Sequence, residues 1–153
     1  MKRLFYLLLL TGLVSCGNDD ETIQEPTLQT VQVTKINSGS TETLTDLSFG
    51  TKTVGYISGT MGTLLKTVDG GTSWTKIQAN IQPSLNCIQA LDDKNVYTAR
   101  NELHQTKDGG STWTTAGLEN VGSGIFFFFF VNATTGFIAK NGVMKSTDSG
   151  KTW

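Results

Sequence analysis

The chain has 153 residues, a formal net charge of −1 and 16 % charged residues. This length fits one ordinary domain. The nearly balanced charge argues against the basic surface of a nucleic-acid-binding protein, so we expect no nucleic-acid partner. Threonine and glycine are abundant whereas alanine and glutamate are sparse, and this balance favours strands and turns over helices.

Residues 1–15 have the composition of an export signal: two basic residues, a short apolar stretch over 4–14 and a small residue before Cys16. The apolar stretch is too short to span a bilayer as a helix, which needs about 20 residues. Its ending, Leu-Val-Ser-Cys-Gly, resembles the lipobox of bacterial lipoproteins. That resemblance implies that Cys16 receives a diacylglycerol, which would anchor the chain in a membrane. The alternative is an ordinary secretory signal with a chance cysteine.

Residues 16–43 are predicted to be the lipidated cysteine, a polar tether and one strand over Leu28–Ile36. The acidic run at 18–21 has two open interpretations, a surface-export signal or a solvated tether. We expect a lipid-anchored protein of the bacterial outer membrane or cell surface. With Cys16 lipidated, Cys87 has no intramolecular disulfide partner, and its apolar strand pattern predicts a buried, unreactive thiol.

One eight-residue pattern occurs three times, at residues 67–74, 106–113 and 146–153. Each copy contains an aspartate, a glycine and a terminal tryptophan: Asp69, Gly71 and Trp74; Asp108, Gly110 and Trp113; Asp148, Gly150 and Trp153. The aspartates are 39 and 40 residues apart. A fixed period of this size indicates a repeat architecture.

The predicted repeats cover about residues 44–77, 85–118 and 125–153. In chain order, each has a first strand with spaced apolar residues, a second short strand, a third strand that leads into the repeated pattern, and a fourth that starts at the tryptophan; the third repeat ends there. Four short strands in about 40 residues are typical of a β-propeller blade. We therefore expect an all-β fold, a partial β-propeller of about three four-stranded antiparallel blades with the last one incomplete.

The repeated pattern resembles the Asp box, or BNR-like repeat, of sialidases, sortilin-type receptors and photosystem II stability/assembly-factor-like propellers. All three copies fit the consensus Ser/Thr-x-Asp-x-Gly-x-Thr/Ser-Trp. The phrases at 55–59 and 136–139 are most similar to the photosystem II assembly-factor-like repeats. This resemblance implies a non-catalytic propeller that binds protein, with its Asp boxes on the periphery and away from the ligand.

The residue types of the box suit a tight turn. A short carboxylate can accept backbone N–H bonds from the turn that it begins, glycine tolerates a positive φ, and tryptophan covers the hairpin. We therefore interpret the box residues as structural, and expect Asp108→Ala to weaken folding without removing a ligand contact. One aspartate per turn is poor calcium chemistry, so we expect no metal and no cofactor.

Residues 126–130 are five consecutive phenylalanines. In the alignment of the repeats, Phe127 and Phe129 match Asp46 and Ser48. A continuous apolar run is typical of a strand that is buried on both faces, which is the interpretation we favour; the alternative is an exposed aromatic platform for a sugar or a partner.

An enzyme is not expected. Sialidases hold the substrate carboxylate with an arginine triad, whereas Arg100 is the only arginine after residue 3. Tyr56 and Tyr97 lie in strand patterns and should pack rather than act as nucleophiles, and His104 is the only histidine, which excludes a multi-histidine zinc site. The alternative function is a truncated sialidase-like glycoside hydrolase.

Three blades cannot close a ring of 4 to 8 blades, and the strand expected after Trp153 is absent. We therefore expect a fragment of a longer propeller; the alternative is a short protein that completes itself by oligomerising. The first functional hypothesis is a non-catalytic, lipid-anchored envelope scaffold that binds an unknown protein or glycan. A purely structural surface-layer component is a weaker third hypothesis.

Overall fold

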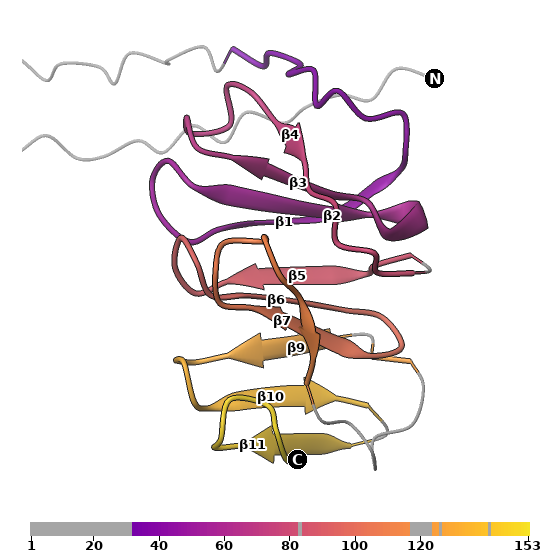
Figure 1. Ribbon diagram of the computed structural model, residues 1–153, viewed down its shortest axis with the longest axis vertical. Coiled ribbons are helices and arrows are strands. Elements are labelled where there is room, and N and C mark those ends of the chain that lie inside the picture. The colour runs from indigo at the N-terminus through magenta and orange to yellow at the C-terminus, as the bar shows by residue number, and fades with distance from the viewer. Residues whose placement is uncertain (1–31, 83, 117–123, 126, 141) are drawn as a thin grey trace, which may run out of the picture. The chain divides into compact units, whose positions relative to one another are not determined.

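The computed structural model describes residues 32–82, 84–116, 124–125, 127–140 and 142–153 (Figure 1). The chain divides into two compact units, 1–33 and 34–153. Of the first unit, only residues 32 and 33 are described, and both are exposed without regular structure. The predicted signal segment, Cys16 and most of the tether therefore lie outside the described residues.

The second unit is all-β, as predicted, and consists of three antiparallel sheets. The first contains β1 (Leu44–Phe49), β2 (Gly55–Gly59), β3 (Leu64–Thr67) and β4 (Thr75–Lys76). The second contains β5 (Cys87–Ala90), β6 (Val96–Ala99), β7 (Leu103–Thr106) and β8 (Thr114–Thr115). The third contains β9 (Phe127–Phe130), β10 (Gly136–Ala139) and β11 (Val143–Ser146).

Each sheet is a simple meander in which strands consecutive in the sequence pair with one another. The same register recurs at the first hairpin of every sheet, where Phe49 pairs with Gly55, Ala90 with Val96 and Phe130 with Gly136. This repetition confirms the predicted partial propeller of three blades. The only helical element among the described residues is the single 3-10 turn Thr60–Gly62, and no described helix has the length and apolar composition needed to cross a bilayer.

The hydrophobic core lies between successive sheets rather than inside any one of them. The first cluster joins the first two sheets and consists of Tyr56, Leu64, Ile81, Leu85, Ile88, Ala90 and Val96. The second joins the last two sheets and consists of Cys87, Tyr97, Ala99, Leu103, Ala116, Ile125, Phe128, Phe130 and Ile138. The first strands β1, β5 and β9 succeed one another along the stack (Figure 1).

Polar side chains fasten each sheet to the next at the first strands. Backbone N–H groups of β5 donate to Asp46 Oδ2 and Ser48 Oγ, both at 2.9 Å. At the next interface the Gln89 amide donates to the Phe130 carbonyl at 2.9 Å and accepts from the Phe130 N–H at 2.7 Å. These bonds fix how the sheets are stacked, because a shift of one residue would break them.

The strand predicted over Leu28–Ile36 is wrong for the part that the structure describes. Residues 32–36 are exposed and belong to no strand, while residues 28–31 lie outside the described residues. The sequence has β propensity there, but residues 32–36 pair with no other strand, and propensity alone does not hold a strand in water. The fourth strands begin one residue after Trp74 and Trp113, rather than at them.

The expectation that the phenylalanine run is buried on both faces is wrong for half of the residues that can be judged. Phe128 and Phe130 are buried at 8 % and 1 % exposure, whereas Phe127 and Phe129 are 72 % and 59 % exposed. Residue 126 lies outside the described residues. Successive side chains of a strand point to opposite faces, and only one face of β9 packs on the preceding sheet.

Candidate functional site

The three Asp boxes adopt one hydrogen-bond pattern. In the first, Thr67 Oγ1 donates to Asp69 Oδ1 at 2.7 Å and accepts from the Gly71 N–H at 2.9 Å. Asp69 also accepts from the Ser73 N–H at 3.0 Å and from the Ser73 hydroxyl at 2.6 Å. The second and third boxes repeat these four bonds within 0.1 Å. The carboxylate oxygens are thus occupied by the turn itself.

The same bonds change the acidity of the carboxyl groups. The pKa of Asp69 is lowered to about 2, first by the hydroxyl and N–H of Ser73 and then by the hydroxyl of Thr67. The hydroxyls of Thr112 and Thr152 are the first causes of the lowered pKa of Asp108 and Asp148. A carboxylate that accepts several hydrogen bonds is stabilised in its charged form, so these groups are poor general acids.

The remaining box residues close the turn. The Trp74, Trp113 and Trp153 indoles each donate to the carbonyl of the box glycine three residues earlier, at 3.1 to 3.2 Å. Gly71, Gly110 and Gly150 have φ of 90°, 98° and 81°, a region that residues with a Cβ rarely adopt.

Each box is tied to the first turn of its own sheet, not to another box. The backbone N–H groups of Gly70, Gly109 and Ser149 donate to the carbonyls of Thr53, Lys94 and Thr134 at 2.9 to 3.0 Å. The three aspartates therefore lie on three different sheets and do not meet. Within the described ranges, no three His, Cys, Asp or Glu side chains are grouped so that they could hold a metal ion.

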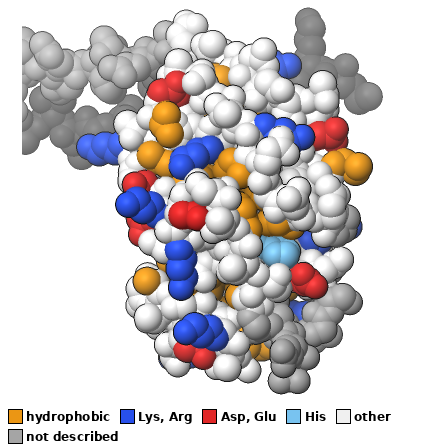
Figure 2. Space-filling model, in the orientation of Figure 1, with side chains coloured by type: hydrophobic (Ala, Val, Ile, Leu, Met, Phe, Trp, Pro, Cys, Tyr) orange, Lys and Arg blue, Asp and Glu red, His pale blue; other side chains and the backbone are white. Residues whose placement is uncertain are grey.

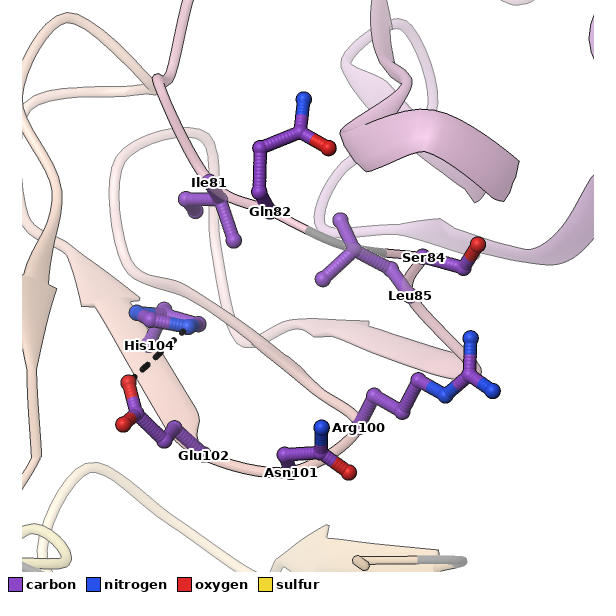
Figure 3. Close-up of a pocket in the computed structure, with 8 residues that line it drawn as sticks. All are labelled: Ile81, Gln82, Ser84, Leu85, Arg100, Asn101, Glu102 and His104. Atoms are coloured by element: carbon purple, nitrogen blue, oxygen red, sulfur yellow. Dashed lines mark ion pairs between the residues drawn. The ribbon is translucent and has the colours of Figure 1, made fainter.

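A pocket lies at the opposite end of the strands from the boxes. Because adjacent strands are antiparallel, the β6–β7 turn and the β7–β8 Asp box lie at opposite ends of β7. The pocket has a volume of about 120 Å³. It is lined by the β4–β5 link and by the β6–β7 turn with the start of β7, through Ile81, Gln82, Ser84, Leu85, Arg100, Asn101, Glu102 and His104 (Figure 3).

The walls of the pocket are held by backbone bonds. The Leu85 N–H donates to the Gly59 carbonyl at 3.0 Å, and the Asn86 N–H donates to the Ala99 carbonyl at 2.9 Å. The link also contacts the 3-10 turn, where the Gln82 side chain donates to the Met61 carbonyl at 3.2 Å. A pocket with fixed walls and a buried apolar floor, supplied by Ile81 and Leu85, is suited to ligand binding.

The polar groups of the pocket have two different environments. His104 is 14 % exposed, its Nε2 lies 3.9 Å from Glu102 Oε2, and its pKa is lowered because burial outweighs the opposing effect of Glu102. The guanidinium of Arg100 points away from this pair (Figure 3). Among the described residues, no side-chain hydrogen bond or ion pair of Arg100 is present. Arg100 therefore offers a forked donor that a carboxylate can bind in bidentate fashion.

Sequence reasoning missed this pocket. In the sequence analysis, Arg100 and His104 were used only to argue against an enzyme. The β4–β5 link has no strand or turn pattern that would indicate a pocket. The one available signal was that the only arginine of residues 4–153 follows β6 directly.

Tyr56 and Tyr97 pack as predicted, with no exposed surface. The pKa of Tyr56 is raised to about 12 by burial and by Asp93, so its hydroxyl stays protonated.

Charged side chains are mixed in sign over the face drawn in Figure 2, where basic and acidic groups alternate and no large single-sign patch is visible. Such a surface gives no strong field toward a polyanion.

Three stacked meander sheets, each carrying the same closed Asp-box turn, define an Asp-box β-propeller repeat protein.

The family model described as "Photosynthesis system II assembly factor YCF48" matches residues 25–153. The chain belongs to this family, which confirms the predicted resemblance. No curated protein sequence gives a significant match.

Solved structures share the fold. The structure described as "YCF48 bound to D1 peptide" is 24 % identical with a TM-score of 0.67, and YCF48 from Cyanidioschyzon merolae is 18 % identical with the same TM-score. Each comparison covers 77 % of this chain but only 42 % and 41 % of the other chain, respectively. A GH74 enzyme of Niastella koreensis is 22 % identical with a TM-score of 0.56, covering 71 % of this chain and 22 % of that enzyme. The chain thus spans about two fifths of the YCF48 structures that it matches.

Proposed function

We propose that the chain is a non-catalytic scaffold that binds an extended protein segment at the pocket between the β4–β5 link and the β6–β7 turn. The observation that carries the proposal is that Arg100 lines the same pocket as the buried apolar residues Ile81 and Leu85. A peptide carboxylate would pair with Arg100, and an adjacent apolar side chain would cover the floor. A family member solved with a peptide supports a peptide as the ligand class.

The pocket does not favour hydrolysis. Glycoside hydrolysis usually needs two carboxyl groups that flank the scissile bond, and the pocket contains one, Glu102. The likeness to the GH74 enzyme concerns the fold alone. We therefore favour a protein ligand over a glycan, and a non-catalytic scaffold over a sialidase-like hydrolase.

The binding proposal is tested with paired ten-residue peptides that end in a free carboxylate or in an amide, by fluorescence anisotropy. We expect the free carboxylate to bind more tightly and Arg100→Gln to weaken it by about tenfold or more, since a charge-assisted bidentate pair is lost. Arg100→Lys should restore part of the affinity because the charge remains without the fork. Lys94→Gln, an exposed lysine in the β5–β6 turn, is the matched control. Equal binding of both peptide forms, or no effect of Arg100→Gln, contradicts the proposal.

We further propose that Cys16 carries a lipid and that the protein is attached to the outer membrane or the cell surface. The support is the sequence alone, namely the basic start, the apolar stretch 4–14 and the small residue before Cys16. The test is intact-mass analysis of protein made in a bacterial host. The wild type should carry a mass increase of acyl chains at Cys16, and Cys16→Ser should lack it and leave the membrane fraction. An unmodified Cys16 in the membrane-associated wild type contradicts the proposal.

A further inference from the structure

The β2–β3 turn of the first sheet is longer than the matching turns of the other two sheets. Between the last paired residues of the hairpin it has five residues, 59–63, whereas the second and third sheets have three, 100–102 and 140–142. The longer turn contains the 3-10 turn Thr60–Gly62, with Met61 at its centre. In repeat proteins, an insertion confined to one repeat is usually a loop on one face, which is often the binding face.

The backbone of Met61 is strained and its side chain is exposed. Met61 is 65 % exposed and has φ 55° and ψ 32°, a left-handed conformation. A residue with a Cβ is strained in this conformation, whereas glycine is not. The other described non-glycine residues with positive φ, Asn80 and Ser149, are polar. A large apolar side chain held exposed at the cost of strain indicates a functional position, because such strain clusters at ligand-binding sites.

The turn is held in place by residues that line the Arg100 pocket. The Met61 N–H donates to Ser84 Oγ at 3.3 Å, and the Met61 carbonyl accepts from the Gln82 side chain at 3.2 Å. A Cβ on Gly62 would collide with the Ile81 carbonyl, so the turn approaches the link closely because that residue is glycine. Ser84, Gln82 and Ile81 all line the pocket. Met61 therefore borders the same pocket.

The position of Met61 does not depend on an open sheet face. On the side away from the link, the turn contacts the segment that precedes β1. The Thr60 N–H donates to the Thr43 carbonyl at 2.8 Å, and the Thr60 hydroxyl donates to Glu42 at 3.2 Å. The turn thus has chain on both sides and lies at the end of the strands, whereas the sheets stack through their faces.

We propose that Met61 determines the specificity of the pocket by packing on an apolar side chain of the bound segment, N-terminal to its carboxylate. This inference rests on the proposed binding of that carboxylate by Arg100. The β4–β5 link is hydrogen-bonded to both turns, and Figure 3 shows the 3-10 turn across the link from the β6–β7 turn. A segment that extends from Arg100 across the link brings its preceding side chains to Met61. The flexible thioether of methionine adapts to apolar partners of different shape.

The test is fluorescence anisotropy with ten-residue peptides that end in leucine with a free carboxylate. A second leucine is placed at one preceding position at a time in a glycine–serine background. We expect one or two neighbouring placements to bind at least about fivefold more tightly than the peptide without a second leucine, since apolar surface leaves water. Met61→Gln should abolish this gain, and Met61→Leu should keep most of it.

Met61→Gly separates ligand contact from a structural role. It removes the side chain and relieves the strain, so the melting temperature should stay the same or rise while the leucine-dependent gain is lost. A turn with only a structural role would keep the gain. The matched control is Val68→Gln, at a 67 % exposed valine in an Asp-box turn at the opposite end of the strands, which should leave the gain unchanged.

The outcomes distinguish this inference from the peptide pocket itself. Arg100→Gln should weaken every peptide by a similar factor, whatever the position of the second leucine. A second leucine that adds no affinity at any position, or a gain that survives Met61→Gln and Met61→Gly, overturns the role of Met61 and leaves that of Arg100 intact. Equal binding of carboxylate and amide peptides refutes the role of Arg100, and absence of binding by every peptide overturns both proposals.

Discussion

The side chain of Gln89 offers the sharpest test of how the sheets are joined. It reaches across the second interface and makes two hydrogen bonds with one residue of β9, at 2.9 Å to the Phe130 carbonyl and 2.7 Å from the Phe130 N–H. Gln89→Ala removes both bonds and leaves both backbone groups without a protein partner. With about 1 kcal/mol net for each hydrogen bond, the expected loss of unfolding free energy is about 2 kcal/mol.

Two further variants refine the expectation. Gln89→Glu keeps an acceptor for the Phe130 N–H but turns a second carboxylate oxygen toward the Phe130 carbonyl, so it should destabilise at neutral pH at least as much as alanine does. Protonation of the glutamate restores a donor. The difference in unfolding free energy between this variant and the wild type should therefore shrink as the pH falls below about 4, near the ordinary glutamate pKa. Gln78→Ala, at an exposed glutamine, should change the free energy by less than about 0.5 kcal/mol.

The assay is urea unfolding followed by tryptophan fluorescence. Trp74, Trp113 and Trp153 belong to different Asp boxes, so the signal reports on each sheet. In a stack of repeats, weakening one interface uncouples its neighbours. Gln89→Ala should therefore also broaden the transition, with the third sheet unfolding first. An unchanged midpoint and slope in Gln89→Ala would refute the claim that this amide fastens the two sheets.

Four other outcomes follow from the geometry. The lowered pKa of Asp69 means that its contribution to stability is present above pH 4 and is lost as the pH falls toward about 2; Asp69→Asn should flatten the midpoint-versus-pH curve in that window, and an unchanged curve contradicts the reasoning. Burial, followed by Asp46, raises the pKa of the Cys87 thiol to about 12, so in a Cys16→Ser background a thiol reagent at pH 8 should react only at the rate of unfolding, whereas immediate labelling would show an accessible thiolate. Phe130→Ala removes a ring that is stacked on Tyr97 at 3.9 Å between centroids, and should lower the unfolding free energy by about 3 to 5 kcal/mol in chemical denaturation; a loss under about 1 kcal/mol would argue against a packed interface. Ser149 has φ 65° where the first two boxes have glycine, so Ser149→Gly should stabilise by about 0.5 to 1 kcal/mol, and destabilisation would count against the shared turn geometry.

The repeat pattern predicted the strands well because strand and turn formation here depends on residue types that are close together in the sequence. The second short strand expected in each repeat is present as β2, β6 and β10. The alignment that matched Phe127 with Asp46 also agrees with the observed register: Asp46 pairs with Ser58 and Phe127 with Ala139, and each partner is the fourth residue of its strand. The repeat period and the turn residues therefore indicate the strand positions even when the packing of the neighbouring sheets is unknown.

Features that depend on neighbouring elements could not be predicted in the same way. The burial of Phe127 and Phe129 depends on whether another sheet covers their face, which their own hydrophobicity does not reveal. The strand expected over Leu28–Ile36 had suitable propensity, but residues 32–36 have no partner strand. The pocket around Arg100 combines a link without periodicity and a turn some 20 residues later, so only the folded chain brings its residues together.

The separation of Asp-box turns from ligand binding is tested most directly by one variant, Asp108→Asn, measured both for its melting temperature and for its affinity toward the carboxylate-ended peptides. Asp108 accepts from the N–H and the hydroxyl of Thr112 at 2.9 and 2.5 Å, at the end of β7 opposite the Arg100 pocket. We predict a lower melting temperature with peptide affinity unchanged at temperatures where the variant is folded. An unchanged melting temperature together with lost peptide binding would place the binding site at the Asp boxes and contradict the account.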